Sequence, residues 1–164
     1  MKIHLRTLTI EDKQDIFDYI FHDERIFEAF LGRPVEKIED FNFQRTLDYF
    51  KENACFYYGI ELLENHKCIG MIFETDHHEN TIEIGYAIGR EYWNQGIVTE
   101  ALKSVIDELK IKYPDQRIIA GAFKENIGSW RVMEKSGMIY THTVEKELEW
   151  HGKWHDVVYY EAKR

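Results

Sequence analysis

The sequence is short of the residues that define several large classes of protein. It contains only two cysteines, Cys55 and Cys68, and two isolated thiols in 164 residues do not make a disulfide framework. We expect both to be small, buried hydrophobic side chains. There are also only two prolines and no low-complexity segment or internal repeat, so the chain is expected to be ordered.

Signals for membranes and export are missing as well. No apolar run approaches the roughly 20 residues that a membrane-spanning helix needs. The first residues, from Met1 to Arg6, lack the apolar region and the small-residue cleavage site of a signal peptide. We therefore expect a cytoplasmic protein that has no membrane partner.

Positive charge is scarce, because 21 Lys and Arg residues stand against 30 Asp and Glu, for a formal net charge of -9. Nonspecific binding of nucleic acid needs a basic face, so a nucleic-acid partner is disfavoured. An acidic surface can steer a cationic substrate such as an amine toward its site. It can equally serve solubility alone, and both roles stay open at this point.

Hydrophobic residues make up 44% of the chain and aromatic residues 15%. This composition predicts a single packed domain over 1–164. Short polar turns join most of the expected strands into antiparallel hairpins, whereas a helix joins 81–88 to 117–123 and lets these two lie parallel. The prediction is an α+β domain with helices on both faces of a mixed, mostly antiparallel sheet of about seven strands. The strands are expected over about 3–8, 55–63, 68–75, 81–88, 117–123, 139–150 and 154–162, and the helices over about 12–20, 39–53, 95–113 and 129–135.

The most informative stretch is the turn from Tyr92 to Ala101, between the strand 81–88 and the following helix. Gly96 has no Cβ, so a bulky anion can approach the backbone there. The first amides of the helix lack an intrahelical acceptor, and with the helix dipole they form a site for phosphate. Most such turns with one glycine bind nothing, so the turn alone leaves both alternatives open.

Three segments, in order, resemble the GNAT superfamily of acyl-CoA-dependent N-acetyltransferases. The strand 82–88 and the loop 93–101, with its Thr-Glu-Ala opening of the helix, are similar to the family's fourth strand and coenzyme loop. The most specific match is 126–138, which resembles the Asn-x-x-Ser…Glu-Lys-x-Gly-Phe signature of the branch that includes the ribosomal-protein-alanine acetyltransferases. The likeness covers nearly the whole chain and is weakest over about 22–54.

The resemblance implies transfer of an acetyl group from acetyl-CoA to a primary amine, by direct attack in a ternary complex. It implies that the strand 81–88 splays from 117–123, that backbone groups there pair with the pantetheine arm, and that the amides of the turn hold the pyrophosphate. A backbone amide near Ile88 would stabilise the oxyanion. The residues expected to bind the cosubstrate are Tyr86, Ala87, Ile88, Asn94, Gln95, Gly96, Ile97, Val98, Thr99, Asn126 and Ser129.

Three positions depart from the family's pattern. Trp93 stands where the loop usually has Arg or Gln, as is common in this branch. Val98 is bulkier than the usual residue and could crowd the phosphate. Met133 stands where many members have a tyrosine that protonates the leaving thiolate.

The expected chemistry needs a base and an acid. A lysine-like amine has a pKa of about 10.4, so it arrives protonated and must lose a proton. Glu83, on the strand that reaches the crevice, is the first candidate for the base, and Glu147 and Glu149 are alternatives. A cross-strand ion pair is the other role open to Glu83. Ser129 is the candidate acid, and it is equally suited to cap the helix that follows.

Two other functions stay open: a noncatalytic acetyl-CoA-binding regulatory module, and an unrelated α+β binding domain. The sequence predicts no metal site, because His77 and His78 point to opposite faces of a strand and His151 and His155 flank a turn without cysteine. The acceptor could be a protein N-terminus, a polyamine, an antibiotic amine or a small metabolite. The aromatic C-terminal hairpin would allow a homodimer.

Overall fold

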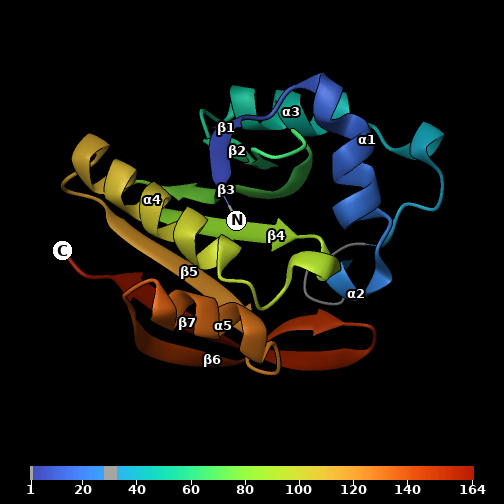
Figure 1. The fold of residues 1–164 in the computed structure, drawn as a ribbon. Coiled ribbons are helices and arrows are strands. Elements are labelled where there is room, and N and C mark those ends of the chain that lie inside the picture. The colour runs from blue at the N-terminus through green and yellow to red at the C-terminus, as the bar shows by residue number, and fades with distance from the viewer. Residues whose placement is uncertain (1, 28–32) are drawn as a thin grey trace.

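The computed structural model describes residues 2–27 and 33–164, and within them a mixed seven-stranded sheet runs through the whole domain (Figure 1). The strand order is β1-β2-β3-β4-β5-β7-β6, and among these described strands only the β4–β5 pair is parallel. The predicted α+β class and mostly antiparallel sheet are confirmed. The strands are β1 (Ile3–Thr7), β2 (Tyr57–Leu62), β3 (Cys68–His78), β4 (Thr81–Ile88), β5 (Arg117–Phe123), β6 (Met138–Trp150) and β7 (Lys153–Ala162).

The helices begin and end close to the predicted limits. The helix expected over 12–20 is built from three consecutive turns, η1, α1 and η2, of which η2 is π-helical. The helices are α1 (Lys13–Ile16), α2 (Glu24–Phe27), α3 (Phe43–Glu52), α4 (Ile97–Lys112) and α5 (Ile127–Lys135), with short turns η1 (Ile10–Asp12), η2 (Phe17–Phe21), η3 (Ile38–Asp40) and η4 (Arg90–Tyr92).

Several predicted boundaries are wrong. The strand expected from residue 55 begins at Tyr57 and the helix expected from residue 95 begins at Ile97. Three others have a clear local reason. The helix expected from residue 39 begins only at Phe43, because the side chain of Asn42 accepts the Arg45 N–H at 3.1 Å and caps the helix there. The strand expected to end at residue 75 continues to His78, because pairing with β4 resumes after a bulge. The helix expected from residue 129 begins at Ile127, one residue after its cap.

Two apolar cores lie on opposite faces of the sheet. In Figure 1, α4 and α5 lie across the front of the sheet, whereas α1 and α3 lie away from them, near β1–β3. Ile82, Ile84 and Ile88 of β4 pack in the core that contains α4. Ala87 packs in the other core, with α1 and α3. The alternation of β4 therefore assigns its even-numbered residues to the α4 face and its odd-numbered residues to the opposite face.

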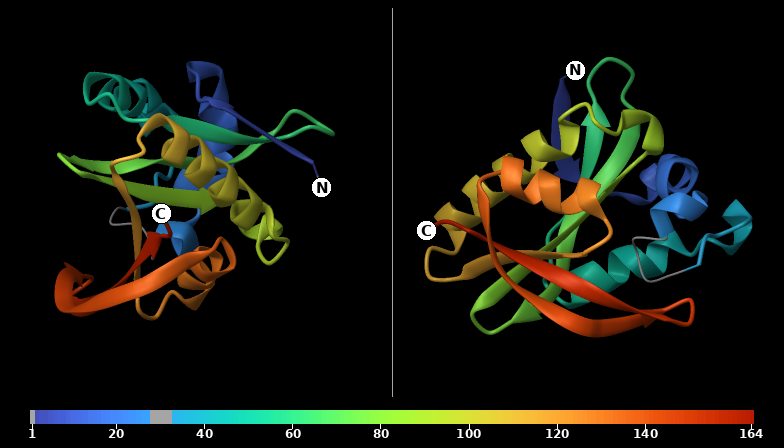
Figure 2. Two further views of the ribbon diagram at one scale, coloured as in Figure 1. Left: turned by 90° about the vertical axis from the view of Figure 1, so that its left-hand side faces the viewer. Right: turned by 90° about the horizontal axis from the view of Figure 1, so that it is seen from below.

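The C-terminal hairpin stands apart from the first four strands. Figure 2 shows β5 crossing from β4 to the β6–β7 hairpin, which lies at some remove from β1–β4. β5 pairs with β7 from Ile119 to Phe123, so it leaves β4 while it stays in the sheet. This course of β5 determines where β4 has an unpaired edge.

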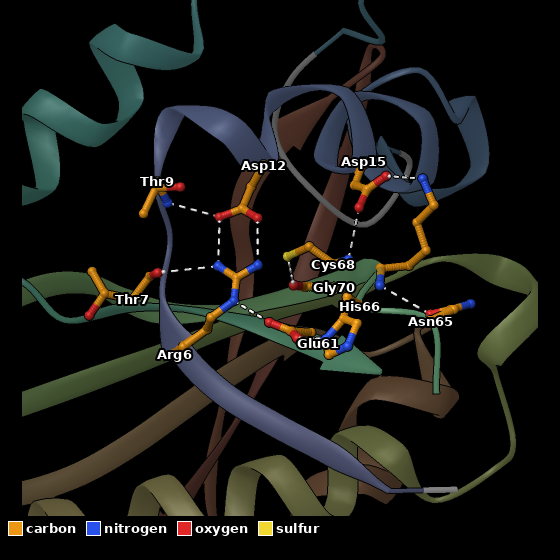
Figure 3. A network of polar contacts seen from close by, with 11 residues as sticks. Arg6, Thr7, Thr9, Asp12, Asp15, Glu61, Asn65, His66, Cys68 and Gly70 are labelled. Carbon is orange, nitrogen blue, oxygen red and sulfur yellow. Dashed lines mark hydrogen bonds and ion pairs between the residues drawn. The ribbon is translucent and has the colours of Figure 1, made fainter. Parts of the chain in front are cut away.

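A buried ion network joins β1 to the first helical turns (Figure 3). The Arg6 guanidinium donates to the two carboxylate oxygens of Asp12 at 2.9 and 2.7 Å, and its Nε donates to Glu61. Asp12 also accepts the Thr9 N–H at 2.8 Å, and Glu61 accepts from His66 Nδ1 at 2.8 Å. The Asp12 and Glu61 side chains are only 7% and 10% exposed, so Arg6 compensates two desolvated charges.

No helix among the described residues is long and apolar enough to cross a membrane. Cys55 and Cys68 form no disulfide bond within the described residues, and both are buried, as predicted. Burial raises the pKa of the Cys68 thiol to about 12, so this thiol stays protonated and unreactive at neutral pH.

Candidate active site

The parallel pair β4–β5 parts halfway along β4. The two strands are in register only at Thr81 with Arg117, Ile82 with Ile118, and Glu83 with Ile119. The rest of β4, residues 84–88, has β3 on one side and no paired strand on the other, within the described chain. We call residues 84–88 the open edge of β4. The predicted splay of these two strands is confirmed.

The hydrogen-bond pattern decides which backbone groups the open edge presents. The Gly89 N–H donates to the Ile69 carbonyl of β3 at 2.9 Å. Because backbone groups alternate along a strand, the N–H and C=O of Ala87 also face β3, where Ala87 lies opposite Met71. The backbone groups of Tyr86 and Ile88 therefore face the open edge. Of the three residues expected to pair with a pantetheine arm, these two have the suitable orientation and Ala87 does not.

The turn into α4, residues 93–99, carries a row of main-chain donors; we call it the phosphate turn. Asn94 and Gly96 have φ of 60° and 77°, and Gly96 is the left-handed cap of α4. The first hydrogen bond of α4 runs from the Glu100 N–H to the Gly96 carbonyl at 3.0 Å. The amides of residues 94–99 have no acceptor within the described part of the chain. Such a group of donors at a helix N-terminus suits a phosphate.

Side chains of the phosphate turn divide between the surface and the core. Asn94, Gln95 and Gly96 are exposed, and the Gln95 side chain donates to the Glu91 carbonyl at 2.8 Å. Ile97 and Val98 are buried in the core beneath α4. The bulk of Val98 therefore points away from the exposed amides, so the crowding expected from the sequence does not arise from its side chain.

Replacing Gly96 with alanine should weaken CoA binding about tenfold or more, because a Cβ would stand in the space above the bare amides. In the protein that space is open, with no atom within 4 Å of where a Cβ would be. Isothermal titration with CoA measures the effect. Gly152→Ala is the matched control, because Gly152 also has a left-handed φ, 73°, with nothing near its Cβ position. Equal losses of affinity in both variants would mean that backbone strain alone was measured.

The first turn of α5 closes the site from the other side. The Asn126 side-chain oxygen caps this helix by accepting the Ser129 N–H at 3.4 Å, which leaves its NH2 group as a donor. The Tyr86 hydroxyl donates to the Ser129 carbonyl at 2.8 Å and accepts from Ser129 Oγ at 3.1 Å. Burial raises the pKa of Tyr86, so the phenol stays protonated at neutral pH. Met133, at the position where many members of the family have a tyrosine, is buried in the core.

Carboxylates gather on the face of the sheet opposite α4. Glu83 lies at the last paired position of β4 and β5, and its neighbours Ile82 and Ile84 are buried against α4, so its side chain takes the other face. On the same face the Tyr159 hydroxyl donates to both oxygens of Glu147, at 2.8 and 2.9 Å. Burial, this hydrogen bond and the charges of Glu147 and Glu83 raise the pKa of Tyr159. Glu83 and Glu147, two of the three candidate bases, therefore both lie near Tyr159 on this face of the sheet.

A bulge in β6 directs Glu147 to this place. The register with β7 shifts between Val144 and Leu148, and Lys146 adopts a left-handed φ of 49°. The Lys146 N–H is held by the Asp156 side chain at 3.0 Å. Glu149, beyond the bulge, is exposed. Bulges of this kind often re-aim a side chain beside a functional site.

Sequence reasoning missed three side chains of this region. Tyr86 was considered only for its backbone, although the two-residue period of β4 already puts its ring on the face of Ile84. The sequence assigns no role to the hydroxyl of Tyr159, and it marks Trp93 only as a departure from the loop pattern, without a role for its indole. The Trp93 Nε1–H donates to the carbonyl of Ile88 at 3.1 Å, a contact that no local pattern signals.

No group of three or more His, Cys, Asp or Glu side chains that could hold a metal ion is present in the described residues.

Comparisons with known proteins agree with this architecture. Residues 2–139 match the family model of the acetyltransferase (GNAT) domain. The probable N-acetyltransferase YjcK of Bacillus subtilis is 26% identical over 166 residues, which cover 94% of this chain and 90% of YjcK.

Two solved structures share the fold. The ribosomal-protein-S5-alanine acetyltransferase of Vibrio fischeri has a TM-score of 0.83 and 20% identity, covering 98% of this chain and 92% of its own. The spermidine N-acetyltransferase of Vibrio cholerae, solved in complex with CoA and spermine, has a TM-score of 0.81 and 17% identity, covering 97% of this chain and 94% of its own. At these identities the likeness concerns the fold alone.

Proposed function

The chain belongs to the GNAT acetyltransferase family and is an acetyl-CoA-dependent acyltransferase, and we propose that it transfers the acetyl group to a primary amine by direct attack within a ternary complex. The observation that carries the proposal is the open edge of β4 beside the phosphate turn. An unpaired strand edge offers hydrogen bonds to an amide-bearing arm, in the manner of strand addition. The bare amides offer a seat for the diphosphate at the end of that arm.

Each part of acetyl-CoA then meets a group suited to it. The diphosphate lies on the amides of residues 94–99, and the amides of the pantetheine arm pair with the backbone of Ile88, which adjoins the phosphate turn, and with the side chain of Asn126. The arm runs on along the open edge toward Tyr86 and the point where β4 and β5 part. The Tyr86 N–H faces this edge, two residues before the position expected from the sequence, and donates to the thioester oxygen as it becomes an oxyanion.

The reaction forms a C–N bond and breaks the C–S bond. The ammonium of the acceptor first loses a proton to Glu83, directly or through a water molecule. The amine nitrogen attacks the carbonyl carbon, the oxyanion collapses, and the thiolate departs. Ser129 Oγ, which already has the Tyr86 hydroxyl as its partner, gives the thiolate a hydrogen bond as it leaves. The nitrogen of the tetrahedral adduct gives up its second proton as the C–S bond breaks, and this proton reaches the thiolate through water or Ser129 Oγ. The products are an amide and CoA as the free thiol, and the first proton passes from Glu83 to solvent.

The acceptor reaches the carbonyl from the face that bears the carboxylates. Glu83 and Glu147 lie on the face of the sheet opposite α4 and α5, and the whole chain has a net charge of -9. A cationic amine is attracted to such a surface. The spermidine N-acetyltransferase of similar fold acts on a polyamine, and the alanine acetyltransferase acts on a ribosomal protein, so both acceptor classes belong in the test.

The test is release of CoA thiol from acetyl-CoA in the presence of an amine panel: peptides with free N-terminal alanine or serine, spermidine and small amines. We expect release with at least one amine, matched by acetylated product in mass spectrometry. The two protein thiols are buried, so they contribute little to the thiol signal. CoA binding without thiol release on any amine would support the noncatalytic module instead. Calorimetry that detects no CoA binding would contradict both functions.

A further inference from the structure

We infer that the Tyr86 phenol is a positioning residue for the transfer: it holds the Ser129 hydroxyl ready for the sulfur that departs. The inference rests on the proposed function and deepens it, because Ser129 is the group proposed to meet the thiolate. It is carried by two contacts between β4 and the first turn of α5. The Tyr86 hydroxyl donates to the Ser129 carbonyl at 2.8 Å, and Ser129 Oγ donates to the Tyr86 hydroxyl at 3.1 Å.

The two faces of β4 separate the incoming amine from the departing thiol. Glu83 lies on the face opposite α4, and the acceptor is proposed to approach from there. Tyr86 is an even-numbered residue of β4, so its ring takes the α4 face and packs against the core that contains α4. The phenol therefore lies on the side of the open edge that the acceptor does not occupy. A sulfur that leaves on the side away from the amine meets Ser129 there.

Tyr86 thus serves two atoms of the thioester. Its N–H faces the open edge and is the donor proposed for the oxyanion, and its phenol contacts Ser129. The oxygen and the sulfur are bonded to the same carbon atom, so their two donors must keep a fixed spacing. A tyrosine has only two side-chain torsions between its backbone and its ring, which makes it a stiff spacer.

The count of hydrogen atoms predicts how the pair responds to a thiolate. Each hydroxyl has one hydrogen: that of Ser129 is given to the phenol, and that of the phenol is given to the Ser129 carbonyl. When the Ser129 hydrogen turns to the sulfur, the phenol can donate to Ser129 Oγ instead, because both oxygens already lie within reach of it. Only hydrogen atoms move. A hydroxyl that accepts a hydrogen bond also donates more strongly, since bonds in a chain polarise one another.

The phenol acts as a donor and not as an acid. A cysteine-like thiol has a pKa of about 8.5 and an ordinary phenol one of about 10, and burial raises the pKa of Tyr86 further. A thiolate is therefore too weak a base to take the proton of Tyr86. The proton that completes the free thiol still comes from the nitrogen of the tetrahedral adduct, so the balance of the reaction is unchanged.

Ser129 needs this partner because of its place in a helix. It is the only hydroxyl side chain of α5, and it is half-buried in the first turn. A serine in a helix can turn its hydroxyl back to a carbonyl of the preceding turn, where it would be lost to the sulfur. Met133, one turn further along α5, is buried and has no hydrogen to donate.

The first test is a double-mutant cycle. Tyr86→Phe keeps the ring and the backbone N–H, and we expect kcat to fall about 3- to 10-fold while the Kd for CoA and the KM for the amine stay unchanged. Ser129→Ala should lower kcat about tenfold or more, and the double variant should lose no more than Ser129→Ala alone. Ser129→Thr, which keeps a hydroxyl, should retain most of the activity. Neither single variant removes a backbone bond of α5, so both should fold.

The second test does not depend on turnover. Free CoA bound to the protein brings its thiol to the same point, and the ultraviolet absorbance of the thiolate follows its ionisation as the pH rises, with desulfo-CoA as the blank. The bound thiol should be about tenfold more acidic in the unaltered protein than in Ser129→Ala, because a hydrogen bond stabilises the thiolate there. In Tyr86→Phe its acidity should lie between the two.

Tyr160→Phe is the matched control. Tyr160 of β7 packs in the same core, and its hydroxyl donates to Glu134 near the other end of α5 at 3.0 Å. It therefore ties α5 to the sheet with a bond of the same kind. The variant should keep the kcat and the acidity of the bound thiol that the unaltered protein has.

Each contrary outcome has a definite meaning. Additive losses in the double variant would overturn the role of the phenol, because Tyr86 would then act through the Ser129 carbonyl and the attachment of α5. An unaltered kcat in Tyr86→Phe, an equal loss in Tyr160→Phe, or a bound thiol no more acidic in the unaltered protein than in Ser129→Ala would overturn it as well. In all these cases the unaltered protein still releases thiol, and the proposed function stands. If it binds CoA and releases no thiol with any amine, the proposed function fails, and the role of Tyr86 fails with it.

Discussion

Replacing Glu83 with glutamine should lower kcat by about 100-fold or more at neutral pH, the lower limit expected when a general base is removed. The carboxylate lies at the point where β4 and β5 part, on the face opposite the coenzyme helices. A neutral amide of the same shape cannot take the proton of an ammonium. The Kd for CoA should not change, since Glu83 faces away from the α4 side. Steady-state rates with the preferred amine and calorimetry with CoA measure the two quantities.

The pH dependence tests the role of Glu83 as a base. An amine that is already deprotonated needs no base, so the deficit of Glu83→Gln should shrink as the pH rises toward the pKa of the amine, about 10.4 for a lysine-like amine. A deficit that stays constant across that range would contradict proton abstraction. It would indicate that Glu83 holds the acceptor in place by charge.

Glu147→Gln provides the comparison. Its carboxylate is held by the Tyr159 hydroxyl at 2.8 and 2.9 Å, so we expect it to orient the acceptor, with a loss of about tenfold that appears mainly in KM. Glu145→Gln is the control, because Glu145 is an exposed carboxylate of the same strand. A larger loss of kcat in Glu147→Gln than in Glu83→Gln would indicate that Glu147 is the base and that Glu83 orients the acceptor.

The elements around the phosphate turn could be predicted from sequence because their signals are local. β4 and β5 have the predicted limits, 81–88 and 117–123, since each is a compact run of β-branched and apolar residues between polar turns. The parting of β4 from β5 followed from a family resemblance and not from the composition of either strand. Its physical cause is the course of β5, which leaves β4 to pair with β7.

The contacts that set the chemistry could not be predicted in the same way. Ala87 and Ile88 are neighbours in a featureless apolar run, and only the register with β3 shows that their backbone groups face opposite directions. The approach of Glu147 to Tyr159 depends on a bulge, and a bulge changes the two-residue period on which strand predictions rely. Strand register and bulges depend on tertiary contacts, which short-range sequence patterns do not predict.

The N-terminal helices take part in the site through η2. The Tyr19 ring packs on the Tyr92 ring, with centroids 5.7 Å apart, and a Cβ on Gly89 would come within 2.9 Å of Tyr19. Arg90 of η4 pairs with Asp23, just after η2. The wall beside the phosphate turn thus depends on how firmly the first helical turns are attached to the sheet. The Arg6 network is one part of that attachment, beside the bond from the Cys68 N–H to Asp15 and the apolar core.

Replacing Arg6 with methionine should lower the free energy of unfolding by about 3 kcal/mol or more, because two buried carboxylates would lose their counter-charge. Asp12 and Glu61 are both nearly inaccessible, and Arg6 is the cation that bonds to both (Figure 3). Urea unfolding at neutral pH measures the loss as a lower midpoint at constant slope. Arg117→Met is the control: its pair with Glu161 is 48% and 24% exposed, and its loss should stay below about 1 kcal/mol.

The free energy of unfolding, measured as the pH is lowered, shows whether Arg6 stabilises the protein through its charge or through the packing of its side chain. Hydrogen bonds from Arg6 and His66 lower the pKa of Glu61 below its ordinary value, so the stability that Glu61 contributes is present above that ordinary value and is lost as the pH falls through the lowered one. In Arg6→Met, Glu61 keeps only His66 as a partner and loses most of what favours its charged form, so acid costs the variant less stability than it costs the unaltered protein. The difference between the two should therefore contract below about pH 4.5. A difference that persists undiminished in acid would mean that Arg6 contributes through the packing of its apolar stem, and that the two carboxylates are not what it stabilises.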